Sequence, residues 1–258
     1  MIELLSAVLV AAAPPPSAMQ FDPRIDEAQR LRSRGLPDDA LKLLEAIEAE
    51  SKTKKDAVSE GRARQKRGDI LLDASDCAGA KAQYEAALKA FGKTDLIASA
   101  QTWNDLGMWG KRCATPADQK IFFGNALNLY EGLKYQKGIR LIANNLGTAN
   151  FVGGDKPTAL GFFKKAAVAA KAMGDDEAWL TVQANVALME LLLSQEKLGH
   201  ECTAFTPAER NDRGFQRAVA AFKEAAQVAQ RSGTTAVSVC AKFGGDYAPL
   251  CEPCLINR

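Results

Sequence analysis

The sequence contains a single histidine, His200, among 258 residues. Metal sites built from three histidines, and zinc motifs with paired histidines, are therefore impossible within one chain. An excess of charge of one sign is also lacking, because 33 basic and 31 acidic residues leave a net charge of +2. That balance gives no general attraction for nucleic acid or for an anionic membrane. After the first twenty residues no apolar run is long enough to span a bilayer, so we expect neither a nucleic-acid partner nor an integral membrane segment.

What is present is an ordinary globular composition that favours helices. Apolar residues make up 47% of the chain and charged residues 25%, which is typical of a folded protein. Alanine is abundant, and it has the highest helix propensity of the amino acids. The length allows one or two domains with a sizeable core.

The first eighteen residues resemble a processing signal. A short apolar run from Leu4 to Ala13 is broken by three prolines and followed by the small residues Ser17 and Ala18. Such a run is typical of a secretory signal peptide rather than of a membrane span. We therefore predict that residues 1–18 are removed and that the protein is exported, to a periplasm or to the cell exterior. No Lys or Arg precedes the run, so the alternative is a cytosolic adaptor or regulator that keeps its N-terminus.

A pattern of small and aromatic residues repeats through the rest of the chain. It reads Ala80-x3-Tyr84-x2-Ala87, Phe123-x2-Ala126, Ala159-x3-Phe163-x2-Ala166 and Ala218-x3-Phe222-x2-Ala225, with a weaker version at Ala40, Leu44 and Ile47. A second pattern precedes these segments, at Gly68, Trp103-x2-Leu106-Gly107, Ala143-x2-Leu146-Gly147 and Val186-Ala187. The period is 39 to 40 residues as far as Ala159, and it lengthens to 59 residues before Ala218.

These residues resemble the tetratricopeptide repeat (TPR), a helix–turn–helix unit. The long period and the Asn144-Asn145-Leu146-Gly147 segment are closest to the kinesin-light-chain-like subclass. The resemblance covers residues 23–231 and implies an all-α fold, an α-solenoid of about five TPR-like units stacked side by side. In the third unit, Gln119 replaces the expected small residue and Gly110 the expected aromatic.

The fifth unit and the end of the chain depart from the repeat. The extra residues of the fifth unit form an insertion at 194–212, between its two helices. Thr115-Pro116 and Thr206-Pro207-x-Glu209 have the form of helix starts, with a capping residue before a first-turn proline. Residues 232–258 are predicted to form a short cysteine-containing tail, in which Thr234 to Phe243 could be a strand and the remainder is irregular.

The six cysteines are Cys77, Cys113, Cys202, Cys240, Cys251 and Cys254. In an exported protein an even number favours disulfides. The stacking that the resemblance implies places Cys77 and Cys113 in neighbouring turns, and we expect them to pair. The other four leave three connectivities open, of which Cys251–Cys254 would staple the tail least. The alternative function is a zinc-binding or redox-active protein centred on those four cysteines, with His200 as a further zinc ligand and Cys251-x2-Cys254 as the motif.

Two other features are more simply structural than functional. Arg62, Arg64, Lys66 and Arg67 are the best candidates for nucleic-acid binding. They do not share one helical face and acidic residues flank them, so we expect a solvated helix surface. The three tryptophans, Trp103, Trp109 and Trp179, lie at helical positions and are expected to pack in the core or between repeats.

In tetratricopeptide repeats the first helix of each unit lines a concave face that commonly binds an extended peptide. The positions that carry over are Gln65, Asp69, Gln101, Asn104, Met108, Lys111, Asn144 and Thr148, and Asn185 is a neighbouring candidate in the fifth unit. Amide side chains both donate and accept hydrogen bonds, which suits a peptide backbone. No set of acid, base and nucleophile stands out. The sequence therefore indicates a non-enzymatic scaffold, without a cofactor, that binds a peptide or protein partner.

Overall fold

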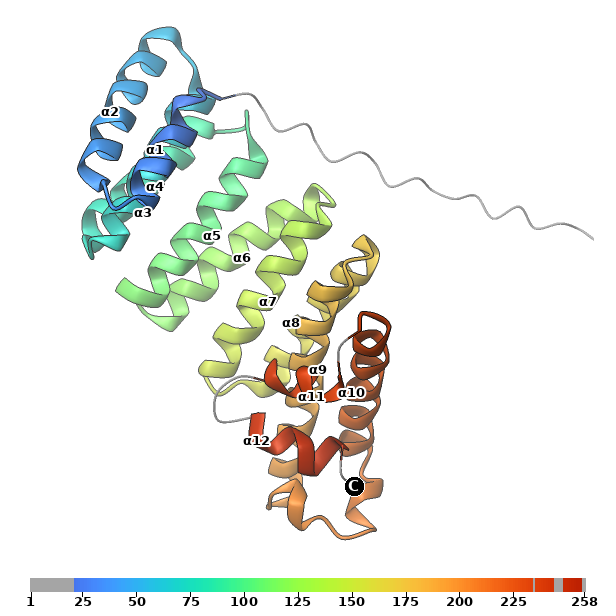
Figure 1. Cartoon of the computed structure of the whole chain (residues 1–258). Helices are drawn as coiled ribbons and strands as arrows, with labels where there is room; N and C mark the ends of the chain where they lie inside the picture. The colour runs from blue at the N-terminus through green and yellow to red at the C-terminus, as the bar shows by residue number, and fades with distance from the viewer. Residues whose placement is uncertain (1–20, 234, 244–247, 257–258) are drawn as a thin grey trace, which may run out of the picture.

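The structure, a computed structural model, describes residues 21–233, 235–243 and 248–256. Within residues 21–233 the chain forms five helical hairpins, which stack side by side into an elongated array (Figure 1). The hairpins pair α1 (Arg24–Ser33) with α2 (Pro37–Lys54), α3 (Ala57–Asp73) with α4 (Cys77–Phe91), α5 (Leu96–Cys113) with α6 (Pro116–Gly132), α7 (Gln136–Val152) with α8 (Lys156–Met173), and α9 (Asp176–Leu198) with α10 (Arg213–Arg231). We call the first helix of each pair helix A and the second helix B. The predicted all-α solenoid is confirmed, whereas the predicted signal segment 1–18 lies outside the described residues.

In the second, third and fourth hairpins, an aromatic side chain of helix B lies against a glycine of helix A. In the fourth hairpin, Phe163 is 3% exposed. A Cβ atom at Gly147 would lie 2.6 Å from its ring. Only glycine lets the two helices approach this closely. The repeated small–aromatic pattern of the sequence therefore encodes the contact between helices A and B.

The two departures in the third hairpin compensate each other. A Cβ atom at Gly110 of α5 would lie 3.0 Å from the Cα atom of Gln119 in α6. The larger side chain on helix B thus faces a residue without a side chain on helix A. The contact between α5 and α6 is preserved by exchanging which helix carries the small residue.

Capping side chains explain most of the helix starts. The Thr115 hydroxyl accepts the N–H of Asp118, whose carboxylate accepts the N–H of Thr115, so the predicted start at Pro116 is confirmed. The predicted start at Pro207 is wrong. Thr206 and Glu209 do form a capping box, but it leads only into a 3-10 turn, Glu209–Asn211. Helix α10 begins later, because the Asp212 carboxylate accepts the N–H groups of Gly214 and Phe215.

The tail continues the helical stack. The predicted strand is wrong, because Ala236–Ala241 form a short helix, α11, that packs against α10 and α9, as the next helix A of a solenoid would. This docking outweighs the strand preference of the β-branched residues, which depends on context. A further short helix, α12 (Ala248–Cys251), and a π-helical turn, Glu252–Ile256, follow, so this part of the tail is not irregular. Cys251, Cys254 and Leu255 join the apolar core of the fifth hairpin, and the tail therefore caps the solenoid.

Candidate functional site

A row of polar side chains joins each helix A to the next, from the second hairpin to the fifth. We call it the polar row. Its members are Arg62, Gln65, Gln101, Asn104, Asp105, Asn144, Asn145 and Asn185. The partners are 39 to 41 residues apart in sequence, which is the repeat period. The polar row therefore defines one continuous face of the helix-A layer, which we call the helix-A face.

The direction of the hydrogen bonds reverses along the row, because α3 donates to α5, whereas α7 donates back to α5 and α9 back to α7. Arg62 of α3 donates to the Gln101 side chain of α5 at 2.5 Å, and the amide of Gln65 donates to Asp105 at 2.6 Å. Further along, Asn145 of α7 donates to Asn104 at 3.0 Å. Asn185 of α9 donates to Asn144 at the same distance. The structure thus brings together five of the predicted site residues.

The remaining predicted positions lie beside the row. Asp69 is half-buried and accepts hydrogen bonds from the Tyr84 hydroxyl and the Lys66 ammonium, each at 3.0 Å. Met108, Lys111 and Thr148 are exposed. The Thr148 hydroxyl donates to the backbone carbonyl of Asn144 within α7.

Two carboxylates share the part of this face nearest the N-terminus. Burial raises the pKa of Asp105 to about 6, and the nearby negative charge of Asp69 acts in the same direction. Hydrogen bonds from Gln65 and Asn104 and the charge of Lys66 oppose the increase. The Asp105 carboxylate is therefore the member of the row whose charge changes closest to neutral pH.

The row also offers unused hydrogen-bonding groups. Among the described residues, the side-chain nitrogens of Gln101 and Asn144 have no acceptor, while their oxygens are occupied. Apolar side chains are exposed beside them, with Met108 at 42% and Leu141 at 41%. By the repeat spacing, Leu141 follows Gln101 at the same position of the next helix A. Free amide donors and exposed apolar side chains therefore occur together on α5 and α7.

The tail closes the C-terminal end of this face. Leu188 of α9, which corresponds to Met108 and Thr148, is only 3% exposed. It belongs to the same apolar core as Cys251, Cys254 and Leu255 of the tail. The Lys242 ammonium donates to the Thr181 hydroxyl at 3.3 Å, which fixes the tail to α9. The open part of the helix-A face therefore comprises the second, third and fourth hairpins.

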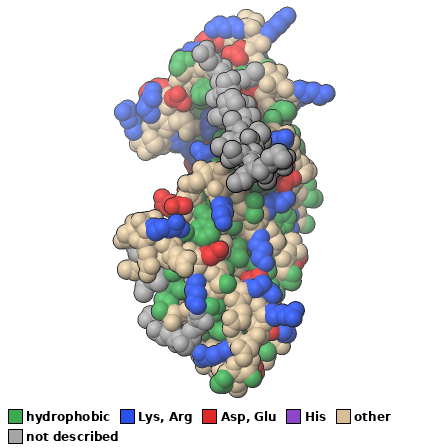
Figure 2. Space-filling view, turned by 90° about the vertical axis from the view of Figure 1, so that its right-hand side faces the viewer, with side chains coloured by type: hydrophobic (Ala, Val, Ile, Leu, Met, Phe, Trp, Pro, Cys, Tyr) green, Lys and Arg blue, Asp and Glu red, His purple; other side chains and the backbone are tan. Residues whose placement is uncertain are grey.

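The basic run of α3, residues 62–67, is engaged in ion pairs with neighbouring carboxylates. The prediction that this run forms a solvated helix surface is therefore wrong. Arg64 and Arg67 bind the carboxylate of Glu48 in α2 at 3.0 and 2.5 Å. Burial acts to raise the pKa of Glu48, but the hydrogen bonds from Lys52 and Arg67 and the charge of Arg64 lower it overall. Arg62 reaches Asp95 at 3.5 Å and lies against the rings of Phe21 and Phe91. Elsewhere, Lys and Arg side chains are scattered over the face seen in Figure 2 without merging into one patch.

All six cysteines lie in the described part of the chain, and they form three disulfides. Cys77 pairs with Cys113, the pairing that the stacking of the repeats implied. Cys202 pairs with Cys254 and Cys240 with Cys251, so the tight Cys251–Cys254 option is wrong. A paired cysteine has no thiolate to offer a metal, and Cys251 and Cys254 do not form one redox disulfide. These pairings overturn the zinc and redox alternative. His200 instead lies 3.4 Å from the Glu209 carboxylate.

Sequence reasoning missed three members of the row, Arg62, Asp105 and Asn145. The sequence does contain a sign of the row, because polar residues recur there at the repeat period. They are Lys66, Asp105, Asn145 and Asn185. Reading the residues pairwise across repeats, rather than one repeat at a time, would have found the bonded partners. The tryptophan prediction is confirmed for Trp109 and Trp179, both 8% exposed, and Trp103 stacks on Phe122.

Comparison with known proteins identifies the fold but no closer relationship. Neither a family model nor a curated protein matches this sequence. Among solved structures, the chain is similar to the Signal Transduction ATPase with Numerous Domains (STAND) protein with a tetratricopeptide repeat sensor from Pyrococcus horikoshii. The TM-score is 0.62 at 15% sequence identity, over 85% of this chain and 31% of that one. The fold is therefore a TPR-like helical repeat. The described residues include no helix with the length and apolar character needed to cross a membrane.

Proposed function

We propose that this protein is a non-enzymatic interaction scaffold that binds a peptide or protein segment on the helix-A face of its second, third and fourth hairpins. The proposal is supported by the TPR-like fold, which typically mediates protein interactions. The observation that carries it is the combination of exposed Met108 and Leu141 with the free amide nitrogens of Gln101 and Asn144. Apolar contact provides binding energy, and amide donors can meet backbone carbonyls of a bound segment.

The polar row has a second role in this proposal. Because Asn104 and Asn144 each accept a hydrogen bond from the next helix A, their side chains are held in fixed orientations. A preorganised surface loses less conformational entropy on binding. Lys111, which is exposed on α5, adds a positive charge at the edge of this face and favours a segment with a carboxylate nearby.

The test is affinity capture from the native host with three forms of the chain. Leu141→Asp places a charge at the centre of the proposed surface, and Ile121→Asp is the matched control. Ile121 is 60% exposed on helix B of the third hairpin, away from the row. The wild type and Ile121→Asp should recover the same partner, and Leu141→Asp should lose at least about nine-tenths of it. Equal recovery by all three forms would reject the helix-A face.

We also propose that the protein is exported, as an expectation supported by its three disulfides. Disulfides persist in oxidising compartments and are rare in the cytosol. Protein isolated from the native host, denatured without reduction and treated with an alkylating reagent should carry no label, because each cysteine is paired. Labelling of most cysteines would instead favour the cytosolic adaptor. The N-terminal residue of the same sample reports whether residues 1–18 have been removed.

A further inference from the structure

A groove runs along the fifth hairpin, between helices α8 and α10, with α9 as its floor. It has a volume of about 550 Å³ and continues into a smaller pocket of about 210 Å³, because both are lined by Lys171, Trp179 and Glu224. The α9 residues of the groove are Trp179, Gln183, Val186 and Glu190, whose spacing places them on one stripe of the helix.

This groove is separate from the helix-A face. Asn185 of the polar row lies about 130° around the helix from the middle of this stripe. The two surfaces therefore lie on different sides of α9, and binding at one does not require binding at the other.

Comparison with the third hairpin explains why the groove exists. There, Phe122 of α6 stacks on Trp103 of α5, with 5.9 Å between the ring centroids. At the corresponding positions the fifth hairpin has Ala221 in α10 and Gln183 in α9, and both line the groove. Two aromatic rings are thus replaced by a methyl group and an amide. The groove is the space that an aromatic side chain fills in the third hairpin.

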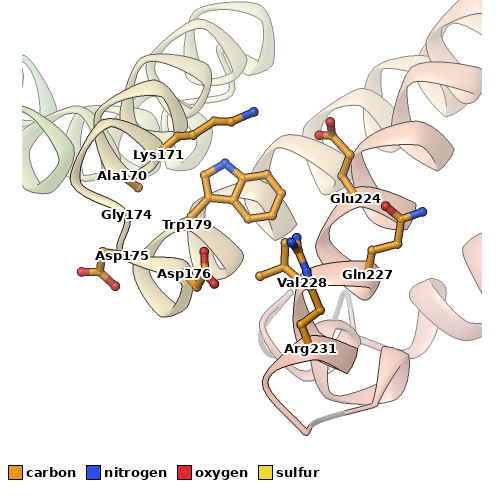
Figure 3. A pocket seen from close by; sticks show the side chains of 10 residues that line it. All are labelled: Ala170, Lys171, Gly174, Asp175, Asp176, Trp179, Glu224, Gln227, Val228 and Arg231. Carbon is orange, nitrogen blue, oxygen red and sulfur yellow. The ribbon is translucent and has the colours of Figure 1, made fainter. Parts of the chain in front are cut away.

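The groove also contains a polar group that is open to a ligand. Trp179 is only 8% exposed, and its indole N–H has no acceptor among the described residues. Figure 3 shows the indole between Lys171 of α8 and the side chains of Glu224, Gln227 and Val228 of α10. The indole nitrogen is not one of the buried side-chain atoms that lack a partner, so it is open to the groove. This N–H is therefore positioned to donate to a ligand that enters the groove.

The charged side chains of the groove differ in depth, with a buried carboxylate at the floor and cations nearer the solvent. Glu190, 1% exposed, lies at the floor and binds Lys164 of α8 at 2.7 Å and Arg217 of α10 at 2.9 Å. The two cations are half-exposed, at 50% and 58%. Lys171 has no acidic partner in the described part of the chain. Glu224 of α10 also lines the groove, and its carboxylate accepts a hydrogen bond from the Gln183 amide at 2.9 Å. The lining, with Lys164, Lys171 and Arg217 against two glutamates, therefore keeps an excess of one positive charge, which complements acidic groups on a ligand.

We propose that this groove binds a segment of a partner protein in which an aromatic residue has acidic neighbours. The aromatic ring occupies the space beside Gln183 and Ala221, a backbone carbonyl accepts the Trp179 N–H, and carboxylates meet Lys164 and Arg217. The site goes beyond the proposed function, because it uses a different side of α9. An aromatic side chain in a desolvated pocket is the usual anchor of such an interface.

Random peptides displayed on phage provide an unbiased test. They are selected on the intact wild-type chain, and enriched sequences are synthesised and measured by calorimetry. Enriched peptides should contain an aromatic residue and carry net negative charge. Ala221→Phe restores the residue of the third hairpin and should weaken their binding at least about tenfold. Gln83→Phe, at the same repeat position in α4, is the matched control and should bind as the wild type does.

A charge reversal keeps the test valid if Ala221→Phe fails to fold. Lys171→Glu should weaken the peptides several-fold, whereas Lys89→Glu, in the last turn of α4, should not. Enriched peptides that are basic, that lack aromatic residues or that bind Ala221→Phe unchanged would overturn the proposal. So would a concentration-dependent dimer that Ala221→Phe abolishes, because the occupant would then be a second copy. Leu141→Asp should leave the peptide affinity intact, which separates this site from the helix-A face.

Discussion

The side-chain amide of Asn145 donates to the side-chain oxygen of Asn104 at 3.0 Å, although the two residues are 41 positions apart in sequence. The bond connects helix A of the fourth hairpin to helix A of the third. Solenoids are stabilised by contacts between neighbouring repeats, and here those contacts include a polar component. The face proposed to bind a partner is therefore also an interface between repeats.

The first prediction concerns this bond. Asn145→Ala should lower the free energy of unfolding by about 1 kcal/mol, because it leaves the half-buried oxygen of Asn104 without its donor. Urea denaturation followed by circular dichroism measures the change. Asn128→Ala is the control, since Asn128 is exposed on α6 and alanine favours a helix. A loss of the same size in both variants would show that the bond contributes nothing.

The second prediction tests the contact between helices A and B. Gly147→Ala should destabilise the protein by about 1–3 kcal/mol, because the added Cβ would lie 2.6 Å from the Phe163 ring. Gly161→Ala in α8 is the matched control, since a Cβ there meets nothing within 4 Å. That variant should be stabilised by up to about 1 kcal/mol, because alanine is the better helix former. Thermal unfolding of both variants would reveal the opposite signs.

The hairpins were predictable because their contacts are local and periodic. Phe163 and Gly147 belong to one unit, and the same pair of residue types recurs in other units. The Cys77–Cys113 pairing followed from the stacking of adjacent units, which depends on the same periodicity. Such features can be inferred from one sequence because each repeat acts as a comparison for the others.

The features that the sequence did not predict depend on contacts that do not recur with the repeat period. The tail pairs Cys254 with Cys202 in the insertion, a contact across 52 residues that the sequence left open among three possibilities. The β-branched residues around Val239 suggested a strand, but docking on α10 made them helical. The groove between α8 and α10 was missed because it arises from the small side chain of Ala221, and an absent aromatic ring leaves no motif in the sequence.

The third prediction is a pH dependence that comes from Asp105. Its pKa in the folded protein is about 6, above the ordinary 3.8. Between these values the folded state binds more protons than the unfolded state, so its contribution to stability falls as the pH rises. Asp105→Asn removes this effect. The variant should exceed the wild type in free energy of unfolding by about 1–2 kcal/mol at pH 7.5 and show no gain from this source at pH 3.5.

Two controls accompany the pH series. Asp39→Asn changes an exposed carboxylate of α2 and should show no comparable rise of stability between the two pH values. Lys66 and Asp69 of α3 are the charged neighbours of Asp105, so both stay unchanged in the series. A constant difference between Asp105→Asn and the wild type across this range would mean that Asp105 titrates normally.

The fourth prediction separates the two disulfides of the tail. In the chain-entropy description, a bridge that closes 52 residues contributes about 4 kcal/mol, whereas one that closes 11 contributes about 3 kcal/mol. Replacing Cys202 and Cys254 by serine should therefore cost more than replacing Cys240 and Cys251. It also releases the tail from the insertion, so backbone amides near Leu188 in α9 should exchange hydrogen faster. Unchanged exchange there would mean that packing alone holds the tail on the helix-A face.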